Sequence, residues 1–142
     1  MDLVGVSILS GAASSEFVFT TAPFESCHAS TLLELPDGGV TWTQAQPIDL
    51  PNPNSGLDAV ALTDGRVVLI YNHTDKGRSP LNLAISRDGE NFRMFHNLES
   101  EPGEYSYPAM IQGKNGDLHI TYTWKRERIR YVRVPLADIP SE

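Results

Sequence analysis

Short apolar runs separated by turn residues make up most of this chain. Polar and apolar residues alternate clearly at 117–122 and at 128–134, as in strands with one buried face. The dipeptides Asp64-Gly65, Asp88-Gly89 and Asn115-Gly116 lie between apolar runs and favour tight hairpin turns. Helical periodicity is nearly absent. The pattern therefore predicts an all-β chain of consecutive antiparallel hairpins, with strands near residues 3–9, 16–20, 28–35, 41–46, 57–63, 66–72, 80–86, 92–97, 106–112, 117–123 and 128–134.

Part of this pattern repeats. The Asp64-Gly65 and Asn115-Gly116 turns lie 51 residues apart, and Tyr71 and Tyr122 are separated by the same interval. A four-stranded β-propeller blade has a period of about 40–50 residues. The repeat thus predicts one full blade from about Leu57 to Leu98 and the start of another at Tyr105, within two to three antiparallel blades per chain.

An earlier copy of the repeat is shortened. Residues 28–38 look like another first strand and turn, but Asp37-Gly38 precedes Asp64-Gly65 by only 27 residues. The missing length corresponds to two strands and their turn. We therefore expect residues 16–142 to form a partial propeller domain and residues 1–15 to be an N-terminal segment that could add a strand.

The charge balance narrows the possible partners. The chain has 11 Lys and Arg against 18 Asp and Glu, a net charge of −7, which argues against nucleic acid as a partner. Residues 125–133 form one local basic cluster, either a solvated strand edge or an anion-binding rim. Cys27 is the only cysteine, and the N-terminus lacks a basic region typical of a signal peptide; both favour a cytoplasmic location without fixing it. No apolar run approaches the about 20 residues that span a bilayer, so no membrane partner is expected.

Two turn motifs point to a family. Residues 86–92, Ser-Arg-Asp-Gly-Glu-Asn-Phe, resemble the Asp box of sialidase-type propellers, although they are one residue short. Residues 37–42, Asp-Gly-Gly-Val-Thr-Trp, match the later part of that box, with Leu35 in place of its serine. In such a box the aspartate caps turn amides and glycine permits a positive φ. Further stretches look like the sialidase-like proteins with BNR repeats, at residues 22–31, 71–74, 77–83, 103–108 and 120–132.

The resemblance implies a sialidase-like β-propeller that is internally shortened. Members similar to this chain carry about six blades, so we expect copies of this chain to complete a propeller as a homo-oligomer, either a dimer or a trimer. In the propeller geometry, the interblade loops and second-to-third-strand loops share the rim that binds sugar. This places one set of residues on the rim: Cys27, His28, Asn72, His73, Arg78, Glu104, Tyr105, Trp124, Arg126 and Arg128.

The resemblance also suggests roles. Tyr105 resembles the sialidase nucleophile and His28 could act as a base or bind sugar hydroxyls, so both are catalytic candidates. Arg78 could clamp a substrate carboxylate, since guanidinium groups bind carboxylates in bidentate fashion. Asn72, Glu104 and Arg126 complete the predicted substrate-binding set. Each has a structural alternative: an interblade tyrosine, a buried histidine, or a solvated loop residue.

Two functions remain open from the sequence. One is a sialidase-like glycoside hydrolase acting on a terminal acidic sugar, although the acid/base aspartate of sialidases falls in the missing strands. The other is a non-catalytic module that binds carbohydrate or only assembles. A uronate-directed lyase using His28 and Tyr105 is a weaker third. The four histidines lack zinc-like spacing and no nucleotide fingerprint is present, so no metal and no cofactor are expected.

Overall fold

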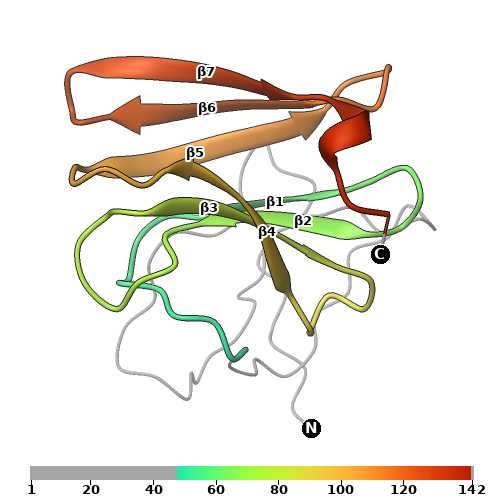
Figure 1. Cartoon of the computed structure of the whole chain (residues 1–142), viewed down its shortest axis with the longest axis horizontal. Helices are drawn as coiled ribbons and strands as arrows, with labels where there is room; N and C mark the ends of the chain where they lie inside the picture. The colour runs from blue at the N-terminus through green and yellow to red at the C-terminus, as the bar shows by residue number, and fades with distance from the viewer. Residues whose placement is uncertain (1–47, 142) are drawn as a thin grey trace, which may run out of the picture. The chain divides into compact units, whose positions relative to one another are not determined.

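The computed structural model describes residues 48–141, which form two antiparallel sheets (Figure 1). The first sheet holds β1 (Asp58–Ala61), β2 (Val67–Tyr71), β3 (Leu81–Ser86) and β4 (Arg93–Glu99), in that order. The second holds β5 (Tyr105–Gln112), β6 (Leu118–Trp124) and β7 (Arg128–Val134), also in chain order. A single 3-10 turn, Leu136–Asp138, follows β7. Each sheet is a meander of neighbouring hairpins.

The predicted fold class is confirmed. Within the described residues the chain is all-β, and its seven strands lie at the seven positions expected there. Gly65 and Gly116 adopt φ values of +87° and +88°, the left-handed conformation that the two repeated turns require. The 51-residue repeat is visible in the pairing as well, since Val60 pairs with Val68 and Ile111 pairs with His119. Strands expected before residue 48 lie outside the described residues.

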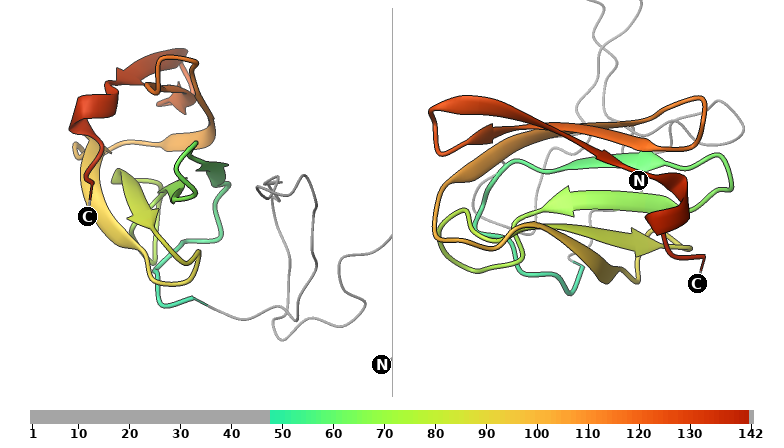
Figure 2. Two further views of the ribbon diagram at one scale, coloured as in Figure 1. Left: turned by 90° about the vertical axis from the view of Figure 1, so that its right-hand side faces the viewer. Right: turned by 45° about the horizontal axis from the view of Figure 1, so that its top comes forward.

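The main core lies between the two sheets. It contains buried residues of both, among them Val68, Ile70 and Leu83 from the first sheet and Ile120 and Tyr122 from the second. The views of Figure 2 show the second sheet lying over the first. Its inner strand β5 contacts β1 and β2. Burial of these β-branched and aromatic side chains is the main stabilising term, at about 25 cal/mol per Å² of apolar surface.

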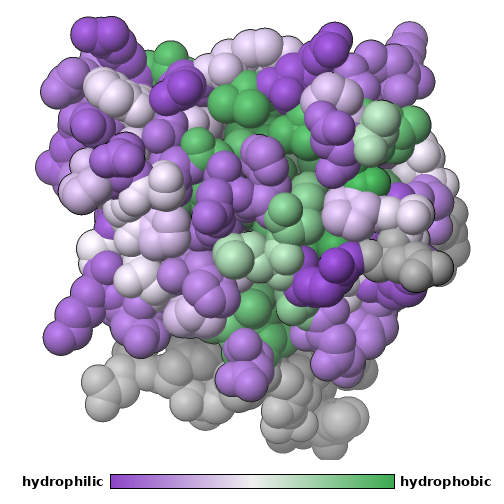
Figure 3. Space-filling model, in the orientation of Figure 1, coloured by the Kyte–Doolittle hydropathy of each residue, from purple (hydrophilic) through white to green (hydrophobic). Residues whose placement is uncertain are grey.

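A polar bond also joins the inner strands of the two sheets. The backbone amide of Met110 in β5 donates a 2.8 Å hydrogen bond to the carboxylate of Asp58 in β1. A second, smaller core lies on the other face of the first sheet, where Leu69, Tyr71 and Ala84 are buried. On the side shown in Figure 3, hydrophobic residues reach the surface in a band flanked by hydrophilic ones. Among residues 48–141, no helix is long and apolar enough to cross a membrane.

Candidate functional site

Three connections meet at one end of the sheets: the β2–β3 loop, the β4–β5 loop and the β6–β7 turn, on the left in Figure 1. Backbone hydrogen bonds hold them together. The amide of Tyr105 donates to the carbonyl of Arg78 at 3.0 Å, and the amide of Lys125 donates to the carbonyl of Glu104 at 2.7 Å. We call this end the rim and define it by Asn72, Arg78, Glu104, Tyr107 and Arg126. Four of these five residues belong to the substrate-binding set expected from the sequence.

Glu104 lies between two arginines of the rim. Its Oε1 atom is 2.7 Å from Nε of Arg126 and 3.9 Å from Nε of Arg78. The hydrogen bond that Arg126 donates to Glu104 raises the pKa of the Arg126 guanidinium, although that side chain is largely exposed. The guanidinium of Arg78 also lies over the ring of Tyr107, 5.3 Å from its centroid. The rim thus holds one carboxylate against two guanidinium groups, leaving an excess of positive charge.

The backbone is strained around this charge cluster. Tyr107 has a φ of +51°, within a β-bulge between Ser106 and Ala109. Lys125 and Arg126 have φ values of +52° and +56°, and the amide of Glu127 closes this turn on the carbonyl of Trp124 at 3.0 Å. The left-handed conformation costs a non-glycine residue about 1–2 kcal/mol. Such strain gathers at functional sites, where it fixes the direction of side chains.

Asn72 is a structural part of the rim. Its side chain is fully buried, and its amide donates to the carbonyls of Pro80 and Tyr105 at 2.9 and 3.1 Å. Its oxygen accepts a 2.7 Å hydrogen bond from the hydroxyl of Ser55. Both amide hydrogens are therefore used within the protein. Asn72 holds the β2–β3 loop to the start of β5, which is the position from which the rim residues project.

Three buried side-chain donors lack a hydrogen-bond partner within residues 48–141: Nδ2 of Asn52, Nη1 of Arg78 and the hydroxyl of Ser106. All three belong to the neighbourhood of Asn72. Ser55 bonds to both Asn52 and Asn72, and Ser106 follows the residue whose carbonyl Asn72 binds. An unpaired buried donor costs about 1–3 kcal/mol. This end of the protein accordingly holds three buried donors for which residues 48–141 supply no acceptor.

Tyr105 lies beneath the rim, in the main core. Its side chain is only 1% exposed, and a Cβ on Gly103 would meet its hydroxyl oxygen at 2.8 Å. Burial raises the pKa of this hydroxyl, and the negative charges of Glu99 and Glu101 raise it further. A nucleophilic tyrosine needs a lowered pKa and access to substrate. The sequence places Tyr105 near the site, and the structure shows a hydroxyl that is covered and hard to ionise.

A buried polar group next to Tyr105 is absent from the sequence-based expectations. Glu99, 9% exposed at the end of β4, accepts hydrogen bonds from the Tyr122 hydroxyl at 2.6 Å and from Arg130 at 2.8 Å. Burial, followed by the bond to Glu99, raises the pKa of Tyr122. The three residues come from three strands, so no spacing in the sequence indicates that they meet. A single oxygen of Glu99, Oε1, accepts both bonds and so ties the three strands together, which fits a structural role.

The structure thus brings together five of the six predicted site residues: Asn72, Arg78, Glu104, Tyr105 and Arg126. The sixth, His28, lies outside the described residues.

Tyr107 and Ser106 also lie at this end of the sheets, and the sequence analysis did not single them out. The feature of the sequence that could have indicated their unusual position is Pro108, because proline disfavours regular pairing of the residues before it. Within residues 48–141, no group of three or more His, Cys, Asp or Glu side chains could hold a metal ion.

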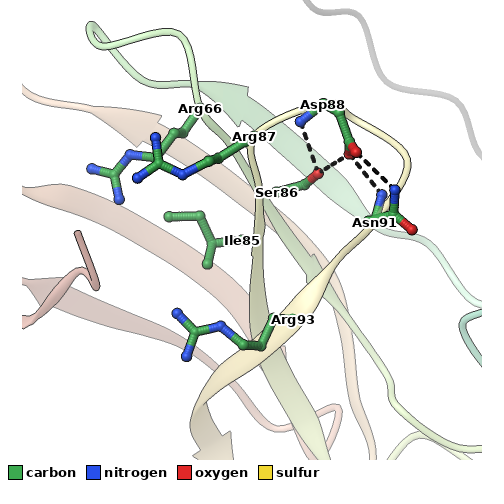
Figure 4. Close-up of a pocket in the computed structure, with 7 residues that line it drawn as sticks. All are labelled: Arg66, Ile85, Ser86, Arg87, Asp88, Asn91 and Arg93. Atoms are coloured by element: carbon green, nitrogen blue, oxygen red, sulfur yellow. Dashed lines mark hydrogen bonds between the residues drawn. The ribbon is translucent and has the colours of Figure 1, made fainter. Parts of the chain in front are cut away.

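The opposite end carries the β3–β4 turn, and its geometry is that of an Asp box. The carboxylate of Asp88 accepts hydrogen bonds from the amides of Glu90 and Asn91 at 2.9 and 2.8 Å. Its partner Ser86 bonds to it at 2.8 Å. Figure 4 shows the bonds of Asp88 with Ser86 and Asn91 directed into the turn, away from the side chains of Arg66 and Arg87. The shallow pocket here is lined by Arg66, Ile85, Ser86, Arg87, Asp88, Asn91 and Arg93.

The arginines of this pocket already have partners in the chain. Arg66 pairs with Asp64 at 2.6 Å and donates to the carbonyl of Pro140, and Arg87 donates to the carbonyl of Ser141 at 2.6 Å. These bonds fasten the segment after β7 to the first sheet. These bonds have a structural role, and Asp88 caps turn amides as the resemblance to an Asp box implies.

Comparison with known proteins agrees with the turn motifs. A family model described as a BNR repeat-like domain matches residues 18–120, which include both expected Asp boxes and the strands β1 to β5. No curated protein matches the chain.

Proposed function

The chain belongs to the family of BNR repeat-like domains, and from this premise we propose that its rim binds the carboxylate of a terminal acidic sugar. The observation that carries the proposal is Arg78. Its Nη1 atom is buried without a partner among the described residues, while its Nε atom is 3.9 Å from Oε1 of Glu104. A guanidinium in this state keeps an N–H donor for which a carboxylate oxygen is the preferred acceptor. Arg126 supplies a second positive charge on the other side of Glu104.

The other rim groups suit the remainder of a sugar. The unpaired donors of Asn52 and Ser106 can bond to hydroxyl or ring oxygens, which are acceptors. The exposed ring of Tyr107, 67% accessible, offers an apolar surface against which a sugar ring can lie. Such a mixture of one charged clamp, a few neutral donors and an aromatic face is typical of small-molecule sites.

Binding is better supported than hydrolysis. A sialidase-like hydrolase would need the tyrosine nucleophile to reach the anomeric carbon, and the hydroxyl of Tyr105 is covered and has a raised pKa. We therefore propose a carbohydrate-binding role for this chain, as a module of a sialidase-like propeller. Hydrolysis of a terminal acidic sugar in an assembly of several copies, with His28 and Tyr105 as catalytic residues, is the alternative.

Two assays separate these functions. A panel of immobilised glycans should retain the protein on structures that end in sialic or uronic acid, and not on their neutral counterparts. A fluorogenic sialoside should show no turnover above the buffer rate at protein concentrations that saturate binding. Turnover that depends on Tyr105 would establish the hydrolase alternative, and binding to neutral glycans alone would remove the carboxylate from the proposal.

A further inference from the structure

The second sheet leaves one face uncovered. Ile111, Ile129 and Tyr131, from β5 and β7, are 64%, 71% and 57% exposed, although strand residues of this kind are normally packed. We call this surface the open face. It is formed by the residues that point away from the main core: Ala109, Ile111, His119, Thr121, Thr123, Ile129, Tyr131 and Arg133.

The internal repeat relates the open face of the second sheet to a face of the first sheet. The pair Val60 and Val68 in the first sheet recurs 51 residues later as Ile111 and His119. Val68 is fully buried, because the second sheet covers that face of the first. The open face is therefore the same side of the repeated unit, in the copy on which no sheet of residues 48–141 lies.

Three of the polar side chains of the open face have partners within the chain. His119 and Tyr131 share a 2.7 Å hydrogen bond, and their rings stack at a centroid distance of 6.1 Å. Arg133 at the edge of this face lies 3.6 Å from Asp117. No acidic side chain belongs to the open face itself, although the chain carries a net charge of −7. Covering this face consequently removes little unpaired charge from water, and it is a place where two acidic chains can approach.

The first sheet does not offer a matching free face. In a head-to-tail ring, the first sheet of one copy would pack on the open face of the next copy. It would do so through the face that carries the smaller core, with Leu69 and Tyr71. Those residues are 6% and 1% exposed, and Leu50, Leu57 and Phe92 of the same chain pack against them. Among residues 48–141, the exposed apolar cluster that a second copy can present is therefore its own open face.

We propose that the open face is the interface of a two-fold symmetric dimer of this chain. An isologous contact pairs a patch with itself and closes after two copies, so it covers the exposed residues of both at once. Dimerisation buries Ile129 and Tyr131 of each chain and extends the layered packing by one further layer. This inference does not depend on sugar binding, since the rim residues lie at the end of the sheets and not on this face.

Light scattering of the full chain, over a wide concentration range, tests the dimer. The expected mass is about twice the 15.6 kDa of one chain. Ile129→Lys puts a charge on the open face and should give a monomer. Met94→Lys is the matched control, because Met94 is 45% exposed on the other face of the first sheet and should leave the dimer intact.

Each alternative outcome overturns the proposal. A folded wild-type chain that stays monomeric at hundreds of micromolar has no such interface, and a trimer excludes two-fold closure. Dissociation by Met94→Lys but not by Ile129→Lys would place the contact on the first sheet. Far-UV circular dichroism must show that Ile129→Lys is folded; if it is not, Thr121→Lys repeats the test from the central strand β6.

Discussion

The hydroxyl of Tyr122 in β6 donates a 2.6 Å hydrogen bond to the carboxylate of Glu99, the last residue of β4, and so links the two sheets at a buried position. Removing that hydroxyl leaves Glu99 with Arg130 as its charged partner. A hydrogen bond to a charged group contributes about 1.5–3 kcal/mol. Tyr122→Phe should therefore lower the free energy of unfolding by about this amount in urea titrations. Tyr107→Phe, at an exposed tyrosine, is the control and should change it by less than about 0.5 kcal/mol.

Asp88 makes the stability of the protein depend on pH. Hydrogen bonds from the side chain of Asn91, and then from the amides of Asn91 and Glu90, hold its pKa below the ordinary value of 3.8. The folded state therefore prefers the ionised carboxylate more than the unfolded state does. The resulting stabilisation is present above pH 4 or so and is lost as the pH falls towards the folded-state pKa. Asp88→Asn should lower stability at pH 7 and flatten its decline in acid, as measured by thermal unfolding from pH 7 to pH 3. If stability declined with falling pH as steeply in Asp88→Asn as in the wild type, the turn would not stabilise the ionised carboxylate of Asp88.

Much of this architecture can be predicted from the sequence, because tight turns depend on the residues within them. Asp64-Gly65 and Asn115-Gly116 fix where the hairpins reverse, and the strands between such turns fall where expected. The grouping of Arg78, Glu104 and Arg126 also follows from the order of strands, since alternate connections of a meander lie at the same end.

The burial and direction of individual side chains are harder to predict from the sequence. Tyr105 and Tyr107 are two residues apart in β5, yet one is buried and the other is 67% exposed at a φ of +51°. A bulge before Pro108 changes the direction of these side chains, and its position depends on tertiary packing. The contact of Glu99 with Tyr122 and Arg130 could not be predicted from sequence spacing either. These residues come from separate strands, and the distance between those strands is set only by the packing of two sheets.

The carboxylate of Glu104 competes with an acidic ligand for the guanidinium groups of the rim. It lies 2.7 Å from Arg126 and partly neutralises the charge that a sugar carboxylate would meet. Glu104→Gln keeps the shape of the side chain and removes its charge. Affinity for an acidic sugar should rise several-fold in isothermal titration calorimetry, and affinity for a neutral sugar should not change. A lower affinity would instead make Glu104 a direct ligand of sugar hydroxyls.

Tyr105 provides the sharpest distinction between binding and hydrolysis. Because its hydroxyl is covered by the backbone near Gly103, Tyr105→Phe should leave the affinity for an acidic sugar within about twofold of the wild type, a difference below 0.5 kcal/mol. The same variant would abolish turnover if the hydroxyl were a nucleophile. Parallel titration and fluorogenic sialoside assays on both proteins decide between these roles.

The central claim is that Arg78 gives the rim its affinity for a carboxylate. The most direct measurement is the affinity of N-acetylneuraminic acid and of glucuronic acid, each compared with its methyl ester, for the wild type and for Arg78→Ala. Arg87→Ala, at the opposite end of the sheets, is the matched control. At least one acid should bind the wild type and the control about 10- to 150-fold more tightly than its ester, equivalent to about 1.5–3 kcal/mol, and Arg78→Ala should abolish that preference. Equal affinity of acid and ester for the wild type, or a preference that survives in Arg78→Ala, would contradict the claim.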